Sequence, residues 1–322
     1  MDFRTTIDIP EYAFRIGHEQ QGLLVGSCFA ASMGERLTEM KMPVTVNPFG
    51  VVYNPMSVIH TLETIENGKS VDANHLTEHN NLWFSFSHHG SFASPDPAEA
   101  MARINQSIVT GQKALRKADY LVLTLGTAWV YELLESGEIV NNCHKLPAKT
   151  FRRRRLSVEE IVSAFECLFG KPLYRDKKII LTVSPIRHLK DGLAENQLSK
   201  ATLLVAVHWL VEQFDNVHYF PAYEILMDDL RDYRFYERDM VHPSAVAVDY
   251  IWERFSGAII STDSQKLFKR IEKIRNARAH RPFNPDTAQH RAFKNALLAE
   301  VIELRGQYPA LDFSEEFNYF SE

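Results

Sequence analysis

The chain alternates short apolar runs with longer segments of helical periodicity, and this alternation constrains its fold more than any other feature. The apolar runs end in small or polar residues and occupy residues 22–27, 43–47, 119–126, 177–185 and 216–222. The helical segments lie at about residues 30–40, 55–66, 96–117, 157–169 and 196–214. Strands that are apolar along their whole length indicate a parallel sheet covered by helices on both faces. We therefore predict an α/β fold, a three-layer α/β/α sandwich around a five-stranded parallel sheet with right-handed crossovers.

Two segments interrupt this alternation. Residues 80–92 alternate polar and apolar side chains, and residues 127–142 contain a Ser-Gly pair of the kind found in hairpin turns. We expect both to form small antiparallel additions at the sheet edge or over the crevice. The last part of the chain is charged and helical, with a proline-rich break at 281–285. This pattern predicts a domain at 1–258 and a C-terminal helical extension at 259–322 that packs on it.

Composition limits the partners and the compartment of this 322-residue chain. A formal net charge of -5 at pH 7 gives no overall attraction to nucleic acid or to anionic lipid. The sequence has no uncharged apolar stretch long enough to span a bilayer and no signal-peptide pattern. Three scattered cysteines, at 28, 143 and 167, do not make a disulfide framework or a zinc site. We expect a cytoplasmic protein with free thiols, no metal and no cofactor, which binds neither nucleic acid nor membrane.

Reactive side chains follow the predicted strands, where the carboxyl ends of a parallel sheet form the ligand crevice. A thiol in the first turn of a helix, as at Cys28, faces the positive end of the helix dipole, which stabilises the thiolate. Asp239 precedes His242 by three residues, so one tight loop can present the carboxylate to the imidazole. The pattern indicates a nucleophile at Cys28, a base at His242 and an orienting carboxylate at Asp239.

Each of these residues also has an ordinary structural interpretation. A small cysteine that closes a strand is most often a buried apolar residue, and a serine such as Ser27 is most often a helix N-cap. A thiol-redox role would require Cys143 to approach Cys28 within bonding distance. From the residues alone these alternatives stay open.

The chain resembles the GSCFA family in five blocks, which occur in order along the sequence. They are GSCFA at 26–30, NPFGVVYNP at 47–55, LTLGTAWVYE at 123–132, LTVSPIRH at 181–188 and DMVHPS at 239–244. This family belongs to the wider group of SGNH or GDSL-type hydrolases. The resemblance implies a flavodoxin-like three-layer fold and an acyl ester hydrolase or acyltransferase with a nucleophile–His–Asp site. The implied substrate is an O-acylated carbohydrate or a related small acyl compound, and a thioester is an alternative acyl donor.

The resemblance also implies roles for individual residues. The final Asp-x-x-His-Pro block makes His242 the general base and Asp239 its partner. Aligned without gaps on the Gly-Asp-Ser-Leu block of the wider group, Cys28 takes the nucleophile position, and a shift of one residue gives that role to Ser27. The backbone N–H groups of Cys28 and Gly50 would hold the oxyanion.

The third oxyanion donor departs from the pattern of the wider group. Its members place an asparagine side chain after the third strand, where this chain has Ala128. The role then falls to Thr127, to Asn47 or Asn54, or to no residue. This departure supports an alternative function, a ligand-binding module that keeps the crevice and has lost efficient chemistry.

Several polar and aromatic residues are candidates for substrate binding. They are Asn54, Gly126, Trp129, His144, Arg187 and His188. We expect Arg187 and His188 to bind a carboxylate or a phosphate, although they could equally belong to a solvated loop in which Asn196 caps the next helix. The four arginines at 152–155 either lie in solvent or form a lid that meets an anionic substrate.

Overall fold

The computed structural model describes residues 4–280, 283–284 and 287–321, and its centre is a five-stranded parallel sheet. The strands are β1 (Gly22–Gly26), β2 (Val44–Val46), β5 (Tyr120–Leu125), β9 (Lys178–Val183) and β10 (Val217–Tyr219). Their order is β2-β1-β5-β9-β10, and each neighbouring pair is parallel. The predicted fold class and its five strands are confirmed. In this flavodoxin-like order the strand sequence reverses between β1 and β5, where a ligand crevice is expected.

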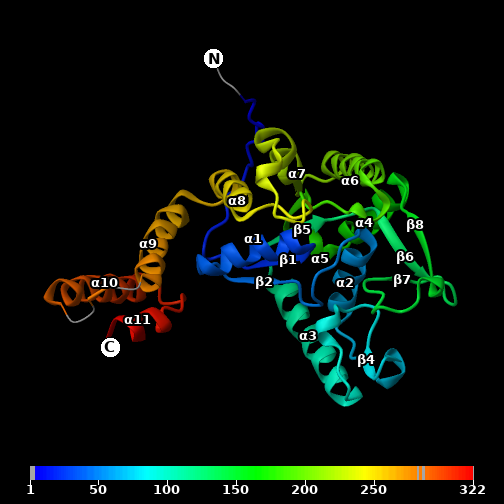
Figure 1. The fold of residues 1–322 in the computed structure, drawn as a ribbon, viewed down its shortest axis with the longest axis horizontal. Helices are drawn as coiled ribbons and strands as arrows, with labels where there is room; N and C mark the ends of the chain where they lie inside the picture. The colour runs from blue at the N-terminus through cyan, green and yellow to red at the C-terminus, as the bar shows by residue number, and fades with distance from the viewer. Residues whose placement is uncertain (1–3, 281–282, 285–286, 322) are drawn as a thin grey trace.

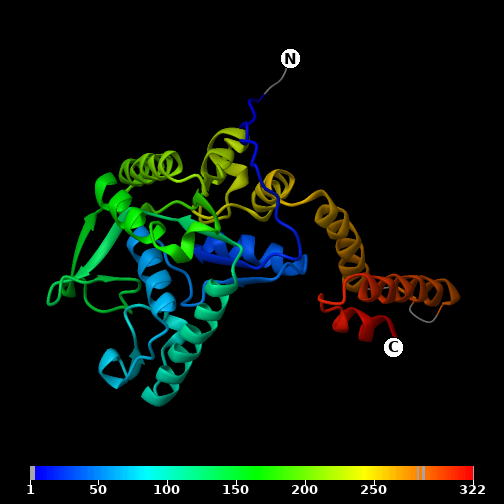
Figure 2. The same ribbon diagram turned by 180° about the vertical axis from the view of Figure 1, so that it is seen from behind.

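Helices cover both faces of the sheet, which gives three layers (Figure 1, Figure 2). Alternate strand residues face opposite layers, as Leu23 and Val25 do on one side and Leu24 on the other. One layer holds α2 (Pro55–Asn67), α3 (Pro97–Lys117), α4 (Val158–Phe169), α5 (Pro172–Arg175) and α6 (Leu193–Gln213). The other holds α1 (Cys28–Glu39), α7 (Ala222–Glu224), the π-helix η5 (Ile225–Leu230) and α8 (Ala245–Ile259). The five helices predicted between the strands are confirmed, with boundaries shifted by a few residues.

Two small antiparallel sheets lie beside the main one. β3 (Thr77–His79) pairs with β4 (Leu82–Phe84), and β6 (Trp129–Leu133) lies between β7 (Ile139–Val140) and β8 (Phe151–Arg155). Short 3-10 turns lie in several connections along the chain. They are η1 (Ala73–His75), η2 (Gly90–Phe92), η3 (Ala148–Thr150), η4 (Leu189–Asp191) and η6 (Tyr233–Phe235). Both expected antiparallel additions are therefore present, and the arginine-rich segment adds a strand to the second one.

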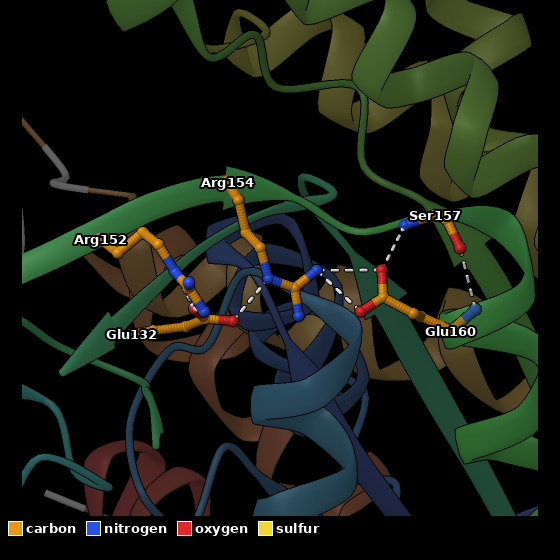
Figure 3. Close-up of polar contacts among 5 residues, drawn as sticks. All are labelled: Glu132, Arg152, Arg154, Ser157 and Glu160. Atoms are coloured by element: carbon orange, nitrogen blue, oxygen red, sulfur yellow. Dashed lines mark hydrogen bonds and ion pairs between the residues drawn. The ribbon is translucent and has the colours of Figure 1, made fainter. Parts of the chain in front are cut away.

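A buried carboxylate holds the arginine-rich strand β8 to β6 (Figure 3). Glu132 is buried, and it accepts hydrogen bonds from Arg152 (2.7 Å) and Arg154 (2.5 Å). Arg154 also donates to Glu160 (2.9 Å), which forms a capping box with Ser157 at the start of α4. Part of the arginine run is thus neutralised within the protein and is not simply solvated.

Three helices form the C-terminal extension, α9 (Thr262–Ala279), α10 (Ala288–Gln307) and α11 (Ser314–Ser321), which reach away from the sheet (Figure 1). Apolar residues of α9 share one buried cluster with α1 and α8. Lys41 pairs with Glu316 at 2.9 Å and so joins the extension to the loop before β2. The division into two domains stays a prediction, and residues 281, 282 and 285 of the predicted proline-rich break lie outside the described residues. None of the described helices is long and apolar enough to cross a membrane.

Gly34 allows α1 to pack closely on β2, and we expect a side chain there to disturb this contact. A Cβ atom on Gly34 would lie 2.4 Å from Cγ2 of Val46, whereas one on Gly257 in α8 would meet nothing within 4 Å. Gly34→Ala should therefore lower the free energy of unfolding by about 1–3 kcal/mol. The matched control Gly257→Ala should raise it by up to about 1 kcal/mol, because alanine restricts the unfolded chain. Urea unfolding measures both, and a stabilised Gly34→Ala protein would contradict the packing.

Candidate active site

A cleft of about 480 Å³ lies at the carboxyl ends of the central strands, and several loops line it. Many of the residues predicted from the sequence meet there: Cys28, Asn54, Thr127, Trp129, Arg187, His188 and His242. The lining also includes Tyr131, expected beside Trp129 after the third strand, and Arg153 of the arginine run that was a candidate lid. Tyr53 and Lys190 line it as well, and the sequence did not single them out as site residues. The topology thus brings together side chains that are distant in the sequence.

The serine and the cysteine after β1 have different environments. Ser27 is buried, and its Oγ accepts a hydrogen bond from the Phe29 N–H (3.2 Å), so it caps α1. Cys28 is half-buried and lines the cleft, with its Sγ 3.8 Å from Oη of Tyr53. Among the described residues none accepts a hydrogen bond from the Cys28 N–H, which stays free at the positive end of the helix. This geometry favours Cys28 over Ser27 as the reactive group.

Asp239 and His242 form a hydrogen-bonded pair at the rim of the cleft. Oδ2 of Asp239 lies 2.7 Å from Nδ1 of His242. Oδ1 accepts hydrogen bonds from the N–H groups of His242 (3.0 Å) and Val241 (2.9 Å). The bonds from the His242 backbone, the His242 ring and the Val241 backbone lower the pKa of Asp239 to about 2. His242 and Cys28 line the same cleft, and no hydrogen bond joins these two described residues.

Two of the predicted oxyanion donors lie outside the cleft lining. Gly50 has a φ of +80°, and its N–H donates to the Asn47 carbonyl (2.8 Å), so this N–H is already engaged in a turn. The Oδ1 of Asn47 accepts from the Gly26 N–H (2.8 Å), while its Nδ2 is buried without a partner. The geometry supports an oxyanion role for neither Gly50 nor Asn47.

The other two candidates, Thr127 and Asn54, do line the cleft. Oγ1 of Thr127 is engaged with Ser199 (3.0 Å) and with the Trp129 N–H (3.1 Å). Asn54 caps α2 by accepting the Ser57 N–H at Oδ1 (2.9 Å), which leaves the two N–H donors of its Nδ2 without a partner among the described side chains. Ala128 is fully buried in the core, so its position cannot present a side-chain donor to the cleft. Of the asparagines proposed as oxyanion donors, Asn54 therefore offers a free carboxamide to the cleft, and Asn142, whose Oδ1 accepts the His144 N–H (2.8 Å), also lines it.

A buried lysine joins the loops that follow β5 and β9. Lys200 of α6 is buried, and its Nζ donates to the carbonyls of Gly126 and Ser184, both at 2.6 Å. Burial lowers the pKa of Lys200 to about 7. In the sequence, Lys200 is a single lysine in a mostly apolar helix. This pattern does not show whether the side chain is buried and bonded to two loops or lies in solvent.

Two polar residues that precede Lys200 in α6 also bind the loops at the strand ends. Ser199 accepts the Ala128 N–H (2.8 Å), and Asn196 accepts the His188 N–H (2.9 Å). Asn196 therefore does not cap α6, as the solvated-loop interpretation expected; the helix begins earlier, at Leu193. The polar residues of this segment order the cleft wall.

The two histidines predicted to bind substrate differ in position. His188 lines the cleft, and burial, followed by the nearby positive charges, lowers its pKa to about 3. It is therefore neutral near pH 7 and cannot form an ion pair with an anion. His144 lies outside the cleft lining, because its ring stacks on Phe84 at 4.0 Å and its Nε2 lies 2.9 Å from the Ser85 carbonyl. A substrate role for His144 is not supported, and its neighbour Cys143 lines the cleft instead.

Comparisons with known proteins match the chain to family models in two regions. A model described as the GSCFA family matches residues 22–255, and one described as the GSCFA domain protein, C-terminal domain, matches residues 271–322. No curated protein matches the chain. The first region contains every residue that lines the cleft.

Replacement of the N-cap tests the different tasks of Ser27 and Cys28. Ser27→Ala removes the acceptor of the Phe29 N–H and should lower the free energy of unfolding by about 1 kcal/mol. Cys28→Ala should change it less, because the sulfur makes one long polar contact. Urea unfolding provides both values, and iodoacetamide should still label Cys28 in folded Ser27→Ala protein. Equal stabilities for wild type and Ser27→Ala would contradict the capping role.

The ionisation of Asp239 can be followed by NMR. The ¹³C carboxyl resonance should titrate at a pH of about 2 in the wild type, and at a higher pH in His242→Ala, which loses the ring's hydrogen bond. Because this pKa lies below the reference value of 3.8, the stabilisation is present above about pH 4 and is lost as the pH falls towards 2. A wild-type titration near pH 4 would show that the bonded pair does not form in solution.

Proposed function

The chain belongs to the GSCFA family, and we propose that it is an acyl ester hydrolase or acyltransferase of the SGNH type. The observation that most supports this proposal is that His242, held by Asp239, opens onto the cleft that also contains Cys28 at the start of α1. The proposed substrate is an O-acylated carbohydrate or a related small acyl compound. In the transfer reaction a thioester can serve as the acyl donor.

Acylation begins with attack of Cys28 Sγ on the acyl carbonyl carbon. Nε2 of His242 accepts the thiol proton, and Asp239 stabilises the resulting imidazolium through Nδ1. The tetrahedral intermediate then collapses to a thioester on Cys28. The bond to the leaving alcohol breaks, and His242 returns the proton to that alcohol's oxygen.

The oxyanion of the intermediate is stabilised by two donors at the cleft. One is the Cys28 N–H at the positive end of α1, and the other is Nδ2 of Asn54. Asn54 thereby replaces the carboxamide that the wider group places at the position of Ala128. Its orientation is fixed, because Oδ1 is already bonded to the Ser57 N–H.

Deacylation repeats these steps with a second nucleophile. Water, or an acceptor hydroxyl in the transfer reaction, gives its proton to His242 and attacks the thioester carbonyl. The new tetrahedral intermediate expels the Cys28 sulfur, which takes the proton back from His242. The products are a free acid or a new ester.

A second candidate function is a ligand-binding module without turnover. Two observations favour it: Ala128 is buried where a donor is expected, and His242 makes no hydrogen bond to Cys28 among the described residues. Such a module would retain a ligand in the same cleft, and Cys28→Ala would leave that binding unchanged.

Intact-protein mass spectrometry after brief exposure to 4-nitrophenyl acetate, and separately to acetyl-coenzyme A, tests the proposed function. We expect one acetyl group on the wild type and none on Cys28→Ala. His242→Ala should slow acylation by about 10²–10⁴-fold. Asn54→Ser keeps an N-cap and removes the carboxamide, and it should slow acylation by about 10²–10³-fold.

Cys167→Ala is the matched control, because Cys167 is an exposed thiol outside the cleft lining, and its loss should change nothing. A label that disappears in Ser27→Ala and persists in Cys28→Ala would move the nucleophile by one residue. If none of the proteins is acylated by either donor, the enzymatic proposal fails and the binding module replaces it.

A further inference from the structure

We infer that the cleft continues into an anion-binding subsite at Arg187, and that the ligand of this protein carries a carboxylate or a phosphate group in addition to its acyl ester. The inference rests on the proposed function, because it describes the substrate of the same site. It starts from the arginines in and near the cleft, of which Arg187 has no carboxylate partner among the described residues.

The arginines near the cleft differ in their partners. Arg153 pairs with Asp191, and Arg155 pairs with Glu195 at 3.1 Å. Arg187 has no carboxylate partner among the described residues, although it lines the cleft. An unpaired guanidinium beside a reaction cleft is available to a bidentate anionic ligand.

Two tyrosine rings hold the Arg187 side chain in place. Its guanidinium carbon lies 4.0 Å from the ring centroid of Tyr236 and 5.2 Å from that of Tyr233. The Arg187 N–H donates to the Val241 carbonyl (3.1 Å), which fixes the backbone beside His242. Contact with aromatic rings engages the faces of the guanidinium and leaves donors at its edge for a ligand. The subsite is therefore ordered before ligand binds.

The cleft and a neighbouring hollow share Arg187. The hollow has a volume of about 120 Å³, and its other lining residues are Leu226, Met227, Arg231, Asp232, Tyr233 and Tyr236. One arginine thus borders the space that contains Cys28 and a second, smaller space. This arrangement suits a ligand whose acyl ester lies at Cys28 while a charged group of the same ligand lies at Arg187.

The remaining charges in and beside the hollow already have partners or are neutral. Asp232 pairs with Arg234 at 2.9 Å, and Arg231 pairs with Asp228 at 3.3 Å. His188, the other residue expected to bind an anion, is neutral because its pKa is about 3. Among the described residues of the hollow, Arg187 is therefore the cation without a carboxylate partner, and in the cleft Lys190, which donates to the Tyr131 hydroxyl (2.5 Å), adds a second positive charge.

Matched thiol reagents test this subsite without requiring turnover. The reagents are maleimides that carry a carboxylate, a phosphonate or a neutral carboxamide on the same two-carbon chain. Peptide mass spectrometry gives the rates of labelling at Cys28 and at the exposed Cys167, which corrects for intrinsic reactivity. In the wild type we expect the anionic reagents to be favoured at Cys28 relative to Cys167. Arg187→Gln should reduce that preference by about five- to tenfold.

Two controls keep the result interpretable. Arg103→Gln, an equal charge change at an exposed position of α3, should leave the preference unchanged. The carboxamide reagent should label Cys28 at the same rate in wild type and Arg187→Gln, which shows that the cleft is intact.

The two anionic arms show whether a carboxylate or a phosphate fits the subsite better. Absence of any anionic preference at Cys28, or an equal preference in wild type and Arg187→Gln, would overturn the inference. Because the maleimides need only an accessible thiol, failure of acylation leaves this test valid, and the two failures are distinguishable.

Discussion

The parallel pairing of β1 with β5 is the contact on which the rest of the site depends. It places the ends of two strands next to each other at the point where the strand order reverses, and their connections leave in different directions. Gly26 makes the close approach possible, since a Cβ there would lie 2.2 Å from the Thr124 carbonyl oxygen. The chain can therefore turn directly from β1 into α1 and present Cys28 to the crevice, opposite the loop that follows β5.

A buried lysine joins two of the loops that form that crevice. Parallel strands end in carbonyl groups that need donors, and Lys200 supplies them to Gly126 and Ser184 from within α6. Burial lowers the pKa of His188, and the charge of Lys200 lowers it further, so His188 is a neutral part of the cleft lining. Arg187 lines the cleft without a carboxylate partner among the described residues, so it is available to an anion from outside the chain. We propose that Cys28 marks the reactive region of this cleft and that Arg187 marks the region that recognises the ligand.

The sequence predicted the sheet and its covering helices well, because continuous apolar runs and helical periodicity report burial directly. It also placed Cys28, Arg187 and His242 at one crevice, since the carboxyl ends of parallel strands must converge. It did not predict which donors are free. Gly50 has its N–H occupied by a turn, and that contact has no signature beyond the glycine itself.

Other errors have similar causes. His144 follows Cys143 directly, yet its φ of +46° belongs to a turn, and its ring packs against Phe84 away from the cleft. The sequence did not predict that Lys200 bonds to the loops after β5 and β9, because its burial depends on which turn of α6 faces the strand ends. Such details arise from tertiary packing, which residue types and spacing do not encode locally. Asn54 was one of the alternatives for the oxyanion donor, and residue type alone did not show that its Oδ1 caps α2 while Asn47 lies outside the cleft lining.

The central claim is that one crevice holds an acyl group on Cys28, with its carbonyl oxygen between the Cys28 N–H and Asn54. A crystal structure of the wild type, flash-cooled after a brief soak with 4-nitrophenyl acetate that captures the thioester before it is hydrolysed, tests it most directly. The account predicts an acetyl group on the Cys28 sulfur, with its oxygen within hydrogen-bond distance of both donors. An acetyl group on Ser27, or a carbonyl oxygen that points away from Asn54 and the start of α1, would contradict it.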